Sequence, residues 1–413
     1  QQAQVLALAD NGDRFIGRVR RDDDFGEHLS NFLRGGFVHY AGKRDDAALG
    51  GDQRGRIGAD AEEAGMARAR GLRVLLVPHL WVESGGWRAE IDPGSDEGWA
   101  AAMQWVKEGH IGKPKLSHAL VHGLRMSIDK VDAAQPPPAT VDYKLWSAPR
   151  PEMPVMRKQF HYDWHWQWPY GNGDIGNQGP HQYDVARWAL GDPDTLPKRV
   201  MSFGNRWGYT DDGHSANCQI AFHPYEPVPL IMDKFGLPSR NVDPKSGEPP
   251  YKGIRTGNII HCEGGYVAES KAYDNEGKTI TKFENFLTGP DHMKNFIDSI
   301  RAGKYTKDVL HIRHGHHAAC LAHLANVSYR LGNAMKAEEI NERLQGDKFG
   351  QELYAEFLKN LANNGIDLAA QPIIAGPWLD FDPVTHQFTG EFAAEANKLC
   401  VEEYAAGFEL PEV

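Results

Sequence analysis

A series of short apolar runs between residues 113 and 285 constrains the fold of this chain most strongly. Runs such as PKLSHALVHG, RVMSFGNRWGY, HSANCQIAFH and VPLIMDKFG have the length and composition of buried strands, and turn residues separate them. Strands that follow one another so closely pair mainly antiparallel, because a parallel pair needs a long crossover. The sequence therefore predicts an α/β domain with a large, mostly antiparallel sheet over residues 113–413.

The first hundred residues show a weaker alternation of strand and helix. QVLALAD at 4–10 and LRVLLVPHLWV at 72–82 are typical of buried strands, and a helix is expected at 96–109. Such alternation indicates a parallel, Rossmann-like layer. Because 413 residues exceed one ordinary core, we predict two domains, at residues 1–112 and 113–413.

The Rossmann-like region lacks the usual phosphate-binding signature. A dinucleotide-binding unit opens with a strand, a G-x-G-x-x-G turn and a helix, and no such run occurs here. The glycine-rich stretch GGDQRGRIG at 50–58 has no apolar strand before it. We therefore expect the N-terminal domain to be atypical or incomplete.

Composition argues against several classes of partner. A net charge of −11 argues against nucleic acid and anionic membranes, and no apolar run approaches the roughly 20 residues of a membrane span. The four cysteines form no CxxC pair, so neither a disulfide framework nor a zinc knuckle is expected. Eleven tryptophans, many near histidine and aspartate, suit either a sugar-binding protein or an aromatic core.

The stretch GNGDIGNQGPHQYDVARWALG at 171–191 predicts a polar loop followed by a short helix. Pro180 marks the start of the helix and Gly191 its end, so we expect a helix over 180–190. His181 then lies in the first turn, where the positive end of the helix dipole disfavours a protonated imidazole. A neutral imidazole can accept or relay a proton near neutral pH.

The loop before this helix supplies further polar side chains. Asp174, Asn177 and Gln178 offer donors and acceptors for hydroxyl groups, and the glycines between them let the backbone approach a ligand closely. Asp184 shares a helix face with His181 at i+3. These residues suit the handling of an alcohol or carbonyl. A histidine that only caps and packs the helix fits the pattern equally well.

The segment HYDWHWQW at 161–168 is the second candidate region. His161 and His165 stand four residues apart, a spacing that can hold a metal on a helix. We favour a sugar platform that uses tryptophans such as Trp166 over a metal site, and plain packing stays open. Lys158 suits either a substrate cation or a solvated charge.

Histidines also gather in HIRHGHHAACLAH at 311–323. His316 and His323 lie on one face of a helix expected over 316–332, with no acid near them in sequence. For His316 we favour lining a substrate pocket, or packing against the sheet, over a zinc site.

Several motifs, in the right order, resemble the glucose–fructose oxidoreductase, inositol dehydrogenase and rhizopine-catabolism (Gfo/Idh/MocA) family. The 171–191 stretch resembles the family's histidine signature, and WVKEGHIGKPKL, VDYKLWSAP and RKQFHYDWHWQW resemble the runs before it. DHMKNFIDSIRAGK, GHHAACLAHLANVSYRLG and GPWLDFDPVTHQFTG are similar to its C-terminal helices and tail. The resemblance covers residues 101–413.

The resemblance implies an N-terminal Rossmann domain that holds NAD or NADP and a C-terminal sheet domain that builds homodimers or homotetramers. It implies hydride transfer to or from a sugar, polyol or related compound, with His181 at the position of the catalytic histidine. The family's aspartate four residues earlier is Asn177 here, which leaves Asp174 as a candidate acid. Asp184 matches the acid three residues later, and Asp10 matches the residue that holds the cofactor ribose.

The N-terminal quarter departs from the family pattern, since neither its Glu-Lys-Pro motif, which carries a catalytic lysine, nor its G-x-G-x-x-G run is present. Three hypotheses therefore stand. The first is an NAD(P)-dependent carbohydrate oxidoreductase. The second is a carbohydrate hydrolase or lyase that uses tightly held NAD or a carboxylate pair from Asp163, Asp174 and Asp184. The third is a non-catalytic sugar-binding relative. The compartment stays open between cytoplasm and periplasm, because such relatives often carry twin-arginine export signals.

Overall fold

The computed structural model describes residues 3–8, 14–19, 99–238, 251–283, 301, 312–401 and 403–408. In the N-terminal segment it describes two strands, β1 (Ala3–Leu8) and β2 (Arg14–Val19), which pair antiparallel. Of the rest of the predicted Rossmann-like layer, the structure describes residues 99–112 alone, and Asp10 lies outside the described residues. Within its described part, this segment therefore forms a hairpin and no parallel strand pair.

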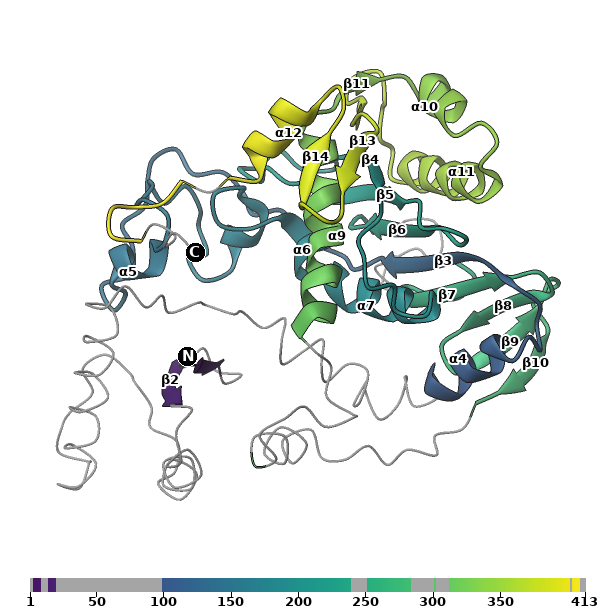
Figure 1. The fold of residues 1–413 in the computed structure, drawn as a ribbon. Helices are drawn as coiled ribbons and strands as arrows, with labels where there is room; N and C mark the ends of the chain where they lie inside the picture. Colours follow the sequence, from purple (N-terminus) through teal and green to yellow (C-terminus); the bar gives the residue numbers. More distant parts are fainter. Residues whose placement is uncertain are drawn as a thin grey trace.

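One large mixed sheet forms the centre of the C-terminal domain. Its strands are β3 (Pro114–Val121), β4 (Arg199–Asn205), β5 (Cys218–His223), β6 (Leu230–Phe235), β7 (Thr256–Cys262), β8 (Gly265–Ala268), β9 (Lys271–Asp274), β10 (Thr279–Lys282), β11 (Asn333–Met335) and β12 (Ile373–Ala375). They run β10–β9–β8–β7–β3–β6–β5–β4–β12–β11 across the sheet (Figure 1). Among these described neighbours β3 and β6 alone pair parallel. The predicted α/β fold with a large, mostly antiparallel sheet is confirmed.

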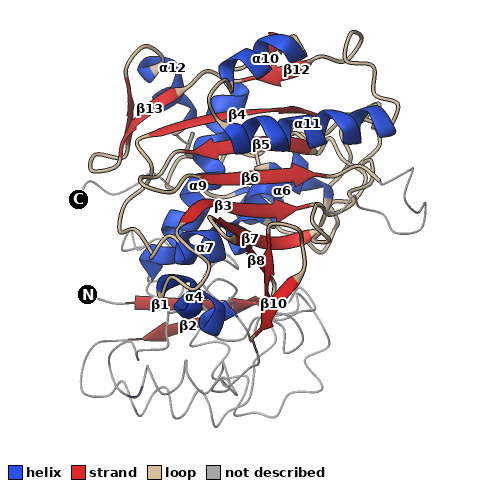
Figure 2. Ribbon diagram, turned by 90° about the vertical axis from the view of Figure 1, so that its right-hand side faces the viewer, coloured by secondary structure: helices blue, strands red, loops and turns tan. Residues whose placement is uncertain are grey.

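Helices cover both faces of this sheet (Figure 2). On one face α7 (Gly179–Ala189) packs on β3 and β7, and α9 (Ile312–Arg330) packs on β4 and against α7. On the other face lies α11 (Lys348–Asn363), close to α10 (Ala337–Arg343). Successive residues of a strand point to opposite faces. Accordingly Ile220 of β5 joins the apolar cluster under α11, whereas Ala221 joins the cluster under α7 and α9.

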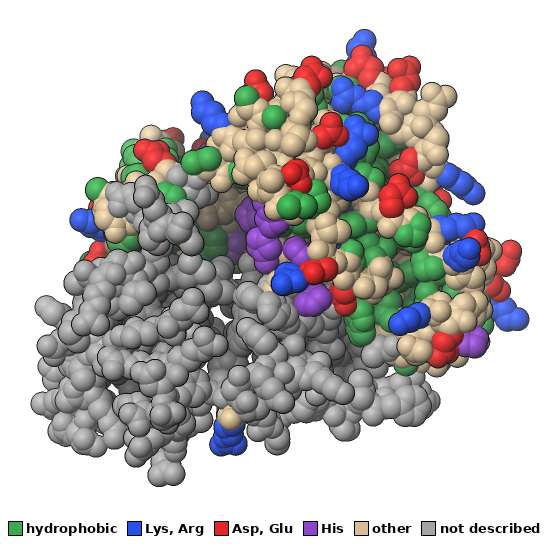
Figure 3. Space-filling view, in the orientation of Figure 1, with side chains coloured by type: hydrophobic (Ala, Val, Ile, Leu, Met, Phe, Trp, Pro, Cys, Tyr) green, Lys and Arg blue, Asp and Glu red, His purple; other side chains and the backbone are tan. Residues whose placement is uncertain are grey.

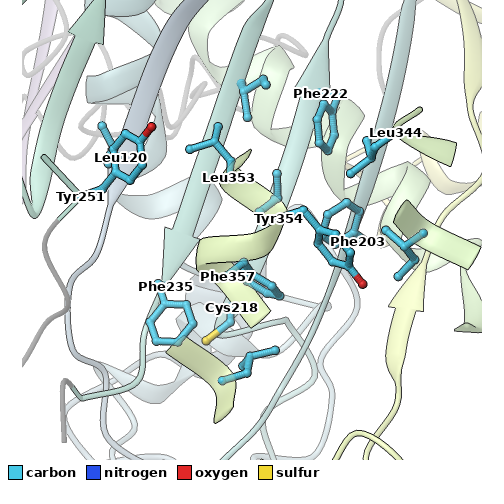
Figure 4. Close-up of a cluster of buried hydrophobic side chains, with 14 of the residues drawn as sticks. Leu120, Phe203, Cys218, Phe222, Phe235, Tyr251, Leu344, Leu353, Tyr354 and Phe357 are labelled. Atoms are coloured by element: carbon cyan, nitrogen blue, oxygen red, sulfur yellow. The ribbon is translucent and has the colours of Figure 1, made fainter. Parts of the chain in front are cut away.

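The cluster under α11 is rich in aromatic side chains (Figure 4). The ring of Phe203 lies edge-on to Tyr354 with centroids 5.2 Å apart, and Phe235 lies edge-on to Phe357 at 5.8 Å. Edge-to-face pairs of this kind are favourable beyond the area that they bury. The resemblance places subunit assembly on an open sheet face. Because α11 covers part of one face, the predicted homo-oligomer would have to use the remainder, and it stays a prediction.

Two further elements extend the domain at its ends. The helix α4 (Trp99–Lys107) packs its apolar side against residues of β7 and β8, so it lies with the C-terminal sheet, whereas the predicted boundary at residue 112 assigned it to the N-terminal domain. The tail adds the hairpin β13 (Leu379–Asp382) and β14 (Gln387–Thr389) and the helix α12 (Ala393–Leu399). No helix in the described ranges is both long enough and apolar enough to cross a membrane.

Candidate functional site

The predicted loop and helix at 171–191 form two short consecutive helices. The first, α6 (Gly173–Asn177), occupies most of the stretch expected to be a loop, and α7 follows it with His181 in its first turn, as predicted. His181 is half-buried, Asn177 is exposed, and Gln178 between them is half-buried. The backbone N–H of His181 donates to the carbonyl of Gln178 at 3.2 Å. The junction of α6 and α7 therefore brings together three of the predicted site residues.

The glycines of this stretch make room for the protein's own groups. Gly173 has a φ of +72°, and a Cβ there would lie 2.7 Å from the Oγ of Ser215. A Cβ on Gly176 would overlap the side chain of Asn172. The expectation that these glycines admit a ligand to the backbone is therefore wrong at both positions, because neighbouring protein groups already occupy the space.

Asp174 lies at the centre of a buried charge cluster. Its side chain is fully buried, with Oδ1 3.0 Å from the Nη2 of Arg125 and Oδ2 3.0 Å from the Nζ of Lys234. Lys234 is also fully buried, and its Nζ donates to the carbonyl of Gly123 at 2.9 Å. Burial alone would raise the pKa of Asp174, but the two cations hold that pKa below its ordinary value. A carboxylate with both oxygens engaged in this way anchors α6 to the sheet.

The other two carboxylates considered for hydrolysis are buried as well. Asp163 is 1% exposed and its Oδ2 accepts the backbone N–H of Gln159 at 2.7 Å; burial raises the pKa of this carboxyl. Asp184 is fully buried within α7. A glycosidase needs two carboxyl groups that flank a bond of the bound sugar. None of the three candidates is placed to do so, so the hydrolase hypothesis loses its carboxylate pair.

The segment 161–168 contains η2 (Asp163–Trp166), a single 3-10 turn that packs against α6. The imidazole of His165 stacks on Trp164 with centroids 3.8 Å apart, and its Nδ1 lies 2.5 Å from the carbonyl of Tyr162. A carbonyl can only accept, so Nδ1 carries the proton and Nε2 is the acceptor nitrogen. Burial lowers the pKa of His165, which favours the neutral ring.

The remaining residues predicted around η2 divide between surface and core. His161 is exposed, and Lys158 is exposed and paired with Asp129 at 2.9 Å. Trp166 is 3% exposed, and its backbone carbonyl accepts N–H groups of the 214–215 turn. Trp164 and His165 therefore form a half-buried aromatic surface, and the ring of buried Trp166 lies 5.4 Å from that of His165.

The two predicted histidines of α9 face different neighbours. His316 is exposed, and its ring stacks on His386 of the β13–β14 hairpin with centroids 5.5 Å apart. The Nε2 of His323 lies 3.5 Å from the side-chain amide of Asn172, the residue that precedes α6. Figure 3 shows histidine side chains gathered on the face beside α9. Sequence spacing placed both histidines on one helix face, and the structure puts His323 beside the α6 loop.

No cofactor site can be assembled from the described residues alone. Within the described ranges no group of three His, Cys, Asp or Glu side chains is arranged to hold a metal ion. The one parallel pair described, β3 with β6, is not followed by a G-x-G-x-x-G turn that would cradle the phosphates of a dinucleotide.

Residues 125–223 match the profile of the oxidoreductase family, C-terminal alpha/beta domain, of the Gfo/Idh/MocA type. The match runs from the end of β3 through η2, α6 and α7 to the end of β5. It therefore includes the junction that carries His181. The predicted resemblance is confirmed, and this segment is similar to the C-terminal domain of that oxidoreductase family.

Solved structures of oxidoreductases are also similar to this chain. They include an oxidoreductase from Thermotoga maritima (11% identity, 59% of this chain and 58% of that one, TM-score 0.35). An oxidoreductase from Agrobacterium radiobacter, in complex with NAD+, L-tartaric acid and magnesium, matches at 12% identity over 60% of each chain (TM-score 0.29). The WlbA dehydrogenase from Bordetella pertussis, in complex with NADH and UDP-GlcNAcA, matches at 12% over 57% of each (TM-score 0.31).

The similarity covers only part of each of these structures. The chain spans less than two thirds of the length of each of these three structures. A comparison with curated proteins gave no match. The family resemblance rests on the match of residues 125–223.

Proposed function

We propose that this chain is an NAD(P)-dependent oxidoreductase that acts on a sugar, polyol or related carbohydrate. The observation that carries the proposal is the position of His181, half-buried in the first turn of α7, beside the exposed amide of Asn177. Both residues lie inside the segment that matches the oxidoreductase family. An imidazole placed between solvent and protein at a helix start suits reversible proton exchange with a bound hydroxyl.

His181 would handle the proton of the reacting group. Oxidation of an alcohol removes a hydride from carbon and a proton from oxygen, and the imidazole would accept that proton; in reduction it would return it. Asn177 cannot take a proton as a carboxylate does, so its amide would orient the hydroxyl. Asp174 would keep α6 fixed to the sheet through Lys234 and Arg125 and would exchange no proton.

The carbohydrate would rest against the aromatic surface of η2. Trp164 and His165 are half-buried and stacked on each other, and η2 packs on α6. Aromatic rings present apolar faces that suit the C–H faces of a sugar. The acceptor nitrogen of His165 would receive a sugar hydroxyl.

Residues that precede Trp99 would bind the nicotinamide cofactor. When bound, it accepts or donates the hydride. The family match at 125–223 supports an oxidoreductase, and hydride transfer to a nicotinamide is the reaction that we propose for it.

An activity screen of the full chain tests this proposal. The chain is incubated with NAD+ or NADP+ and a panel of aldoses, uronic acids and polyols, and reduced nicotinamide is followed by its absorbance. The proposal predicts turnover with at least one of them. Release of reducing sugar from glycosides without nicotinamide reduction would support the hydrolase instead. If the chain binds sugar but neither turns it over nor binds a nucleotide, the hypothesis of a non-catalytic sugar-binding protein would be supported.

A further inference from the structure

A buried arginine lies inside an aromatic cage close to the candidate site. Arg157 is 1% exposed, and its Cζ lies 4.9 Å from the ring centre of Trp146, 4.7 Å from that of Phe160 and 4.9 Å from that of Tyr170. Its Nε donates to the carbonyl of Phe160 at 3.0 Å. The terminal nitrogens Nη1 and Nη2 make no hydrogen bond of normal geometry. The aromatic faces therefore take the place of water around this cation.

The cage joins three separate parts of the chain. Trp146 belongs to α5 (Tyr143–Ser147), Phe160 precedes η2, and Tyr170 immediately precedes the glycine-rich stretch. The hydroxyl groups of Tyr143 and Tyr170 lie 2.8 Å apart, which closes the cage on one side. A single guanidinium thus holds α5, the start of η2 and the start of α6 in one arrangement.

Two segments of the candidate site, here called its two arms, begin at this cage. The first arm starts at Phe160, whose ring lies edge-on to His161 at 5.1 Å, and continues into η2. The second arm starts at Tyr170 and continues through α6 to His181. Gln167 links the arms, because its carbonyl accepts the backbone N–H of Tyr170 at 2.9 Å. Displacement of the guanidinium would therefore move the aromatic surface relative to the α6–α7 junction.

We propose that Arg157 is a positioning residue that fixes the aromatic surface of η2 relative to His181 and so sets the affinity for carbohydrate. With 1% of its surface exposed, Arg157 would act through its neighbours and not by contact with a ligand. The kinetic part of this inference rests on the proposed function, whereas the structural part does not. The burial of a cation that is so poorly hydrogen-bonded is costly. The three rings around the guanidinium offset part of that cost.

Hydrogen exchange and kinetics of the full chain test the proposal, with Arg157→Met and Arg157→Lys. Arg157→Met is expected to speed amide exchange in 159–172 about tenfold or more, with α11 unchanged, because the cage loses its central group. The KM for carbohydrate is expected to rise about tenfold, while kcat and the KM for NAD(P) change less than about twofold. Arg157→Lys keeps the charge without the planar fork, so both effects should be smaller.

The control is Arg187→Met, which removes another fully buried arginine, at the far end of α7. It should lower overall stability without a selective change in 159–172. Exchange in that segment that is unchanged in Arg157→Met, or that rises equally throughout the chain, overturns the positioning role. If amide exchange in Arg157→Met rises selectively in 159–172 but the KM for carbohydrate is unchanged, the proposed effect of Arg157 on carbohydrate affinity is overturned. If the wild-type chain turns over no carbohydrate, the proposed function fails, and the exchange experiment still decides the structural part.

Discussion

Asp174 and Lys234 form an ion pair of 3.0 Å in which both side chains are fully buried. Lys234 comes from β6 at the centre of the sheet, and Asp174 from the first turn of α6. The pair therefore ties the short helix before His181 directly to the sheet. Arg125, next to the end of β3, adds a second contact at 3.0 Å. The residue predicted as a candidate acid is, in this arrangement, an anchor.

Asp174→Asn should destabilise the chain strongly. The change leaves Lys234 buried without its counter-charge, and the loss of one partner of a buried pair costs about 3–5 kcal/mol in the free energy of unfolding. Urea denaturation measures this cost. Asp380→Asn, which breaks the exposed pair with Arg199, should cost less than about 1 kcal/mol. Equal costs for the two variants would contradict the anchoring role.

Gly173→Ala should destabilise the α6 loop. Gly173 has a positive φ, and a Cβ there would press on Ser215. Strain of this kind costs about 1–3 kcal/mol. Gly123→Ala is the matched control, since a Cβ at that position meets no atom within 4 Å and its φ is not in the left-handed region. Thermal unfolding that is identical in the two variants would show that Gly173 is not needed.

The chain should lose stability as the pH falls below about 6.5, because buried histidines must stay neutral. Burial lowers the pKa of His223 to about 3 and that of His261 to about 3, from an ordinary 6.5. Between these values the unfolded chain binds protons that the folded chain does not. Each histidine therefore removes about 1.4 kcal/mol per pH unit from the free energy of unfolding.

Urea denaturation between pH 7 and pH 4 measures this slope. His223→Gln should flatten it by about one proton, since that position then no longer titrates. A slope that His223→Gln leaves unchanged would contradict the assignment.

His323→Ala and His316→Ala should differ in their effect on carbohydrate affinity. His323 lies 3.5 Å from the amide of Asn172 beside α6, whereas His316 stacks on His386 of the tail hairpin. We expect the KM for carbohydrate to rise about fivefold to tenfold in His323→Ala and to stay within twofold in His316→Ala. Steady-state kinetics measure both. The opposite order would place the substrate beside the tail hairpin.

The elements of the sheet could be predicted because their pattern is local. β3, β4, β5 and β6 each fall within a predicted apolar run, and α7 begins within one residue of the predicted start. The start of a helix at Pro180 and the length of a strand depend on residues that are neighbours in the sequence. The family resemblance, too, rested on contiguous motifs, and the profile match over 125–223 confirms it.

The tertiary partners of the site could not be predicted. Asp174 finds Arg125 and Lys234 on other elements, 49 and 60 residues away, and nothing in the spacing marks them as a group. Arg157 is one cation among 45 in the sequence, and the three rings around it come from three separate segments. The glycines suggested an open loop, whereas their neighbours fill the space. The partners of these residues are set by packing between elements far apart in the sequence, and a local sequence pattern carries no information about that packing.

The most direct test of the account is a kinetic comparison of His181→Gln with the wild-type chain on the best carbohydrate from the activity screen. Glutamine keeps hydrogen-bonding groups but cannot exchange a proton. Nicotinamide reduction is expected to slow by a factor of about 100 to 10,000, with the KM for NAD(P) and the unfolding midpoint unchanged. Wild-type rates in His181→Gln, with the fold intact, would contradict it.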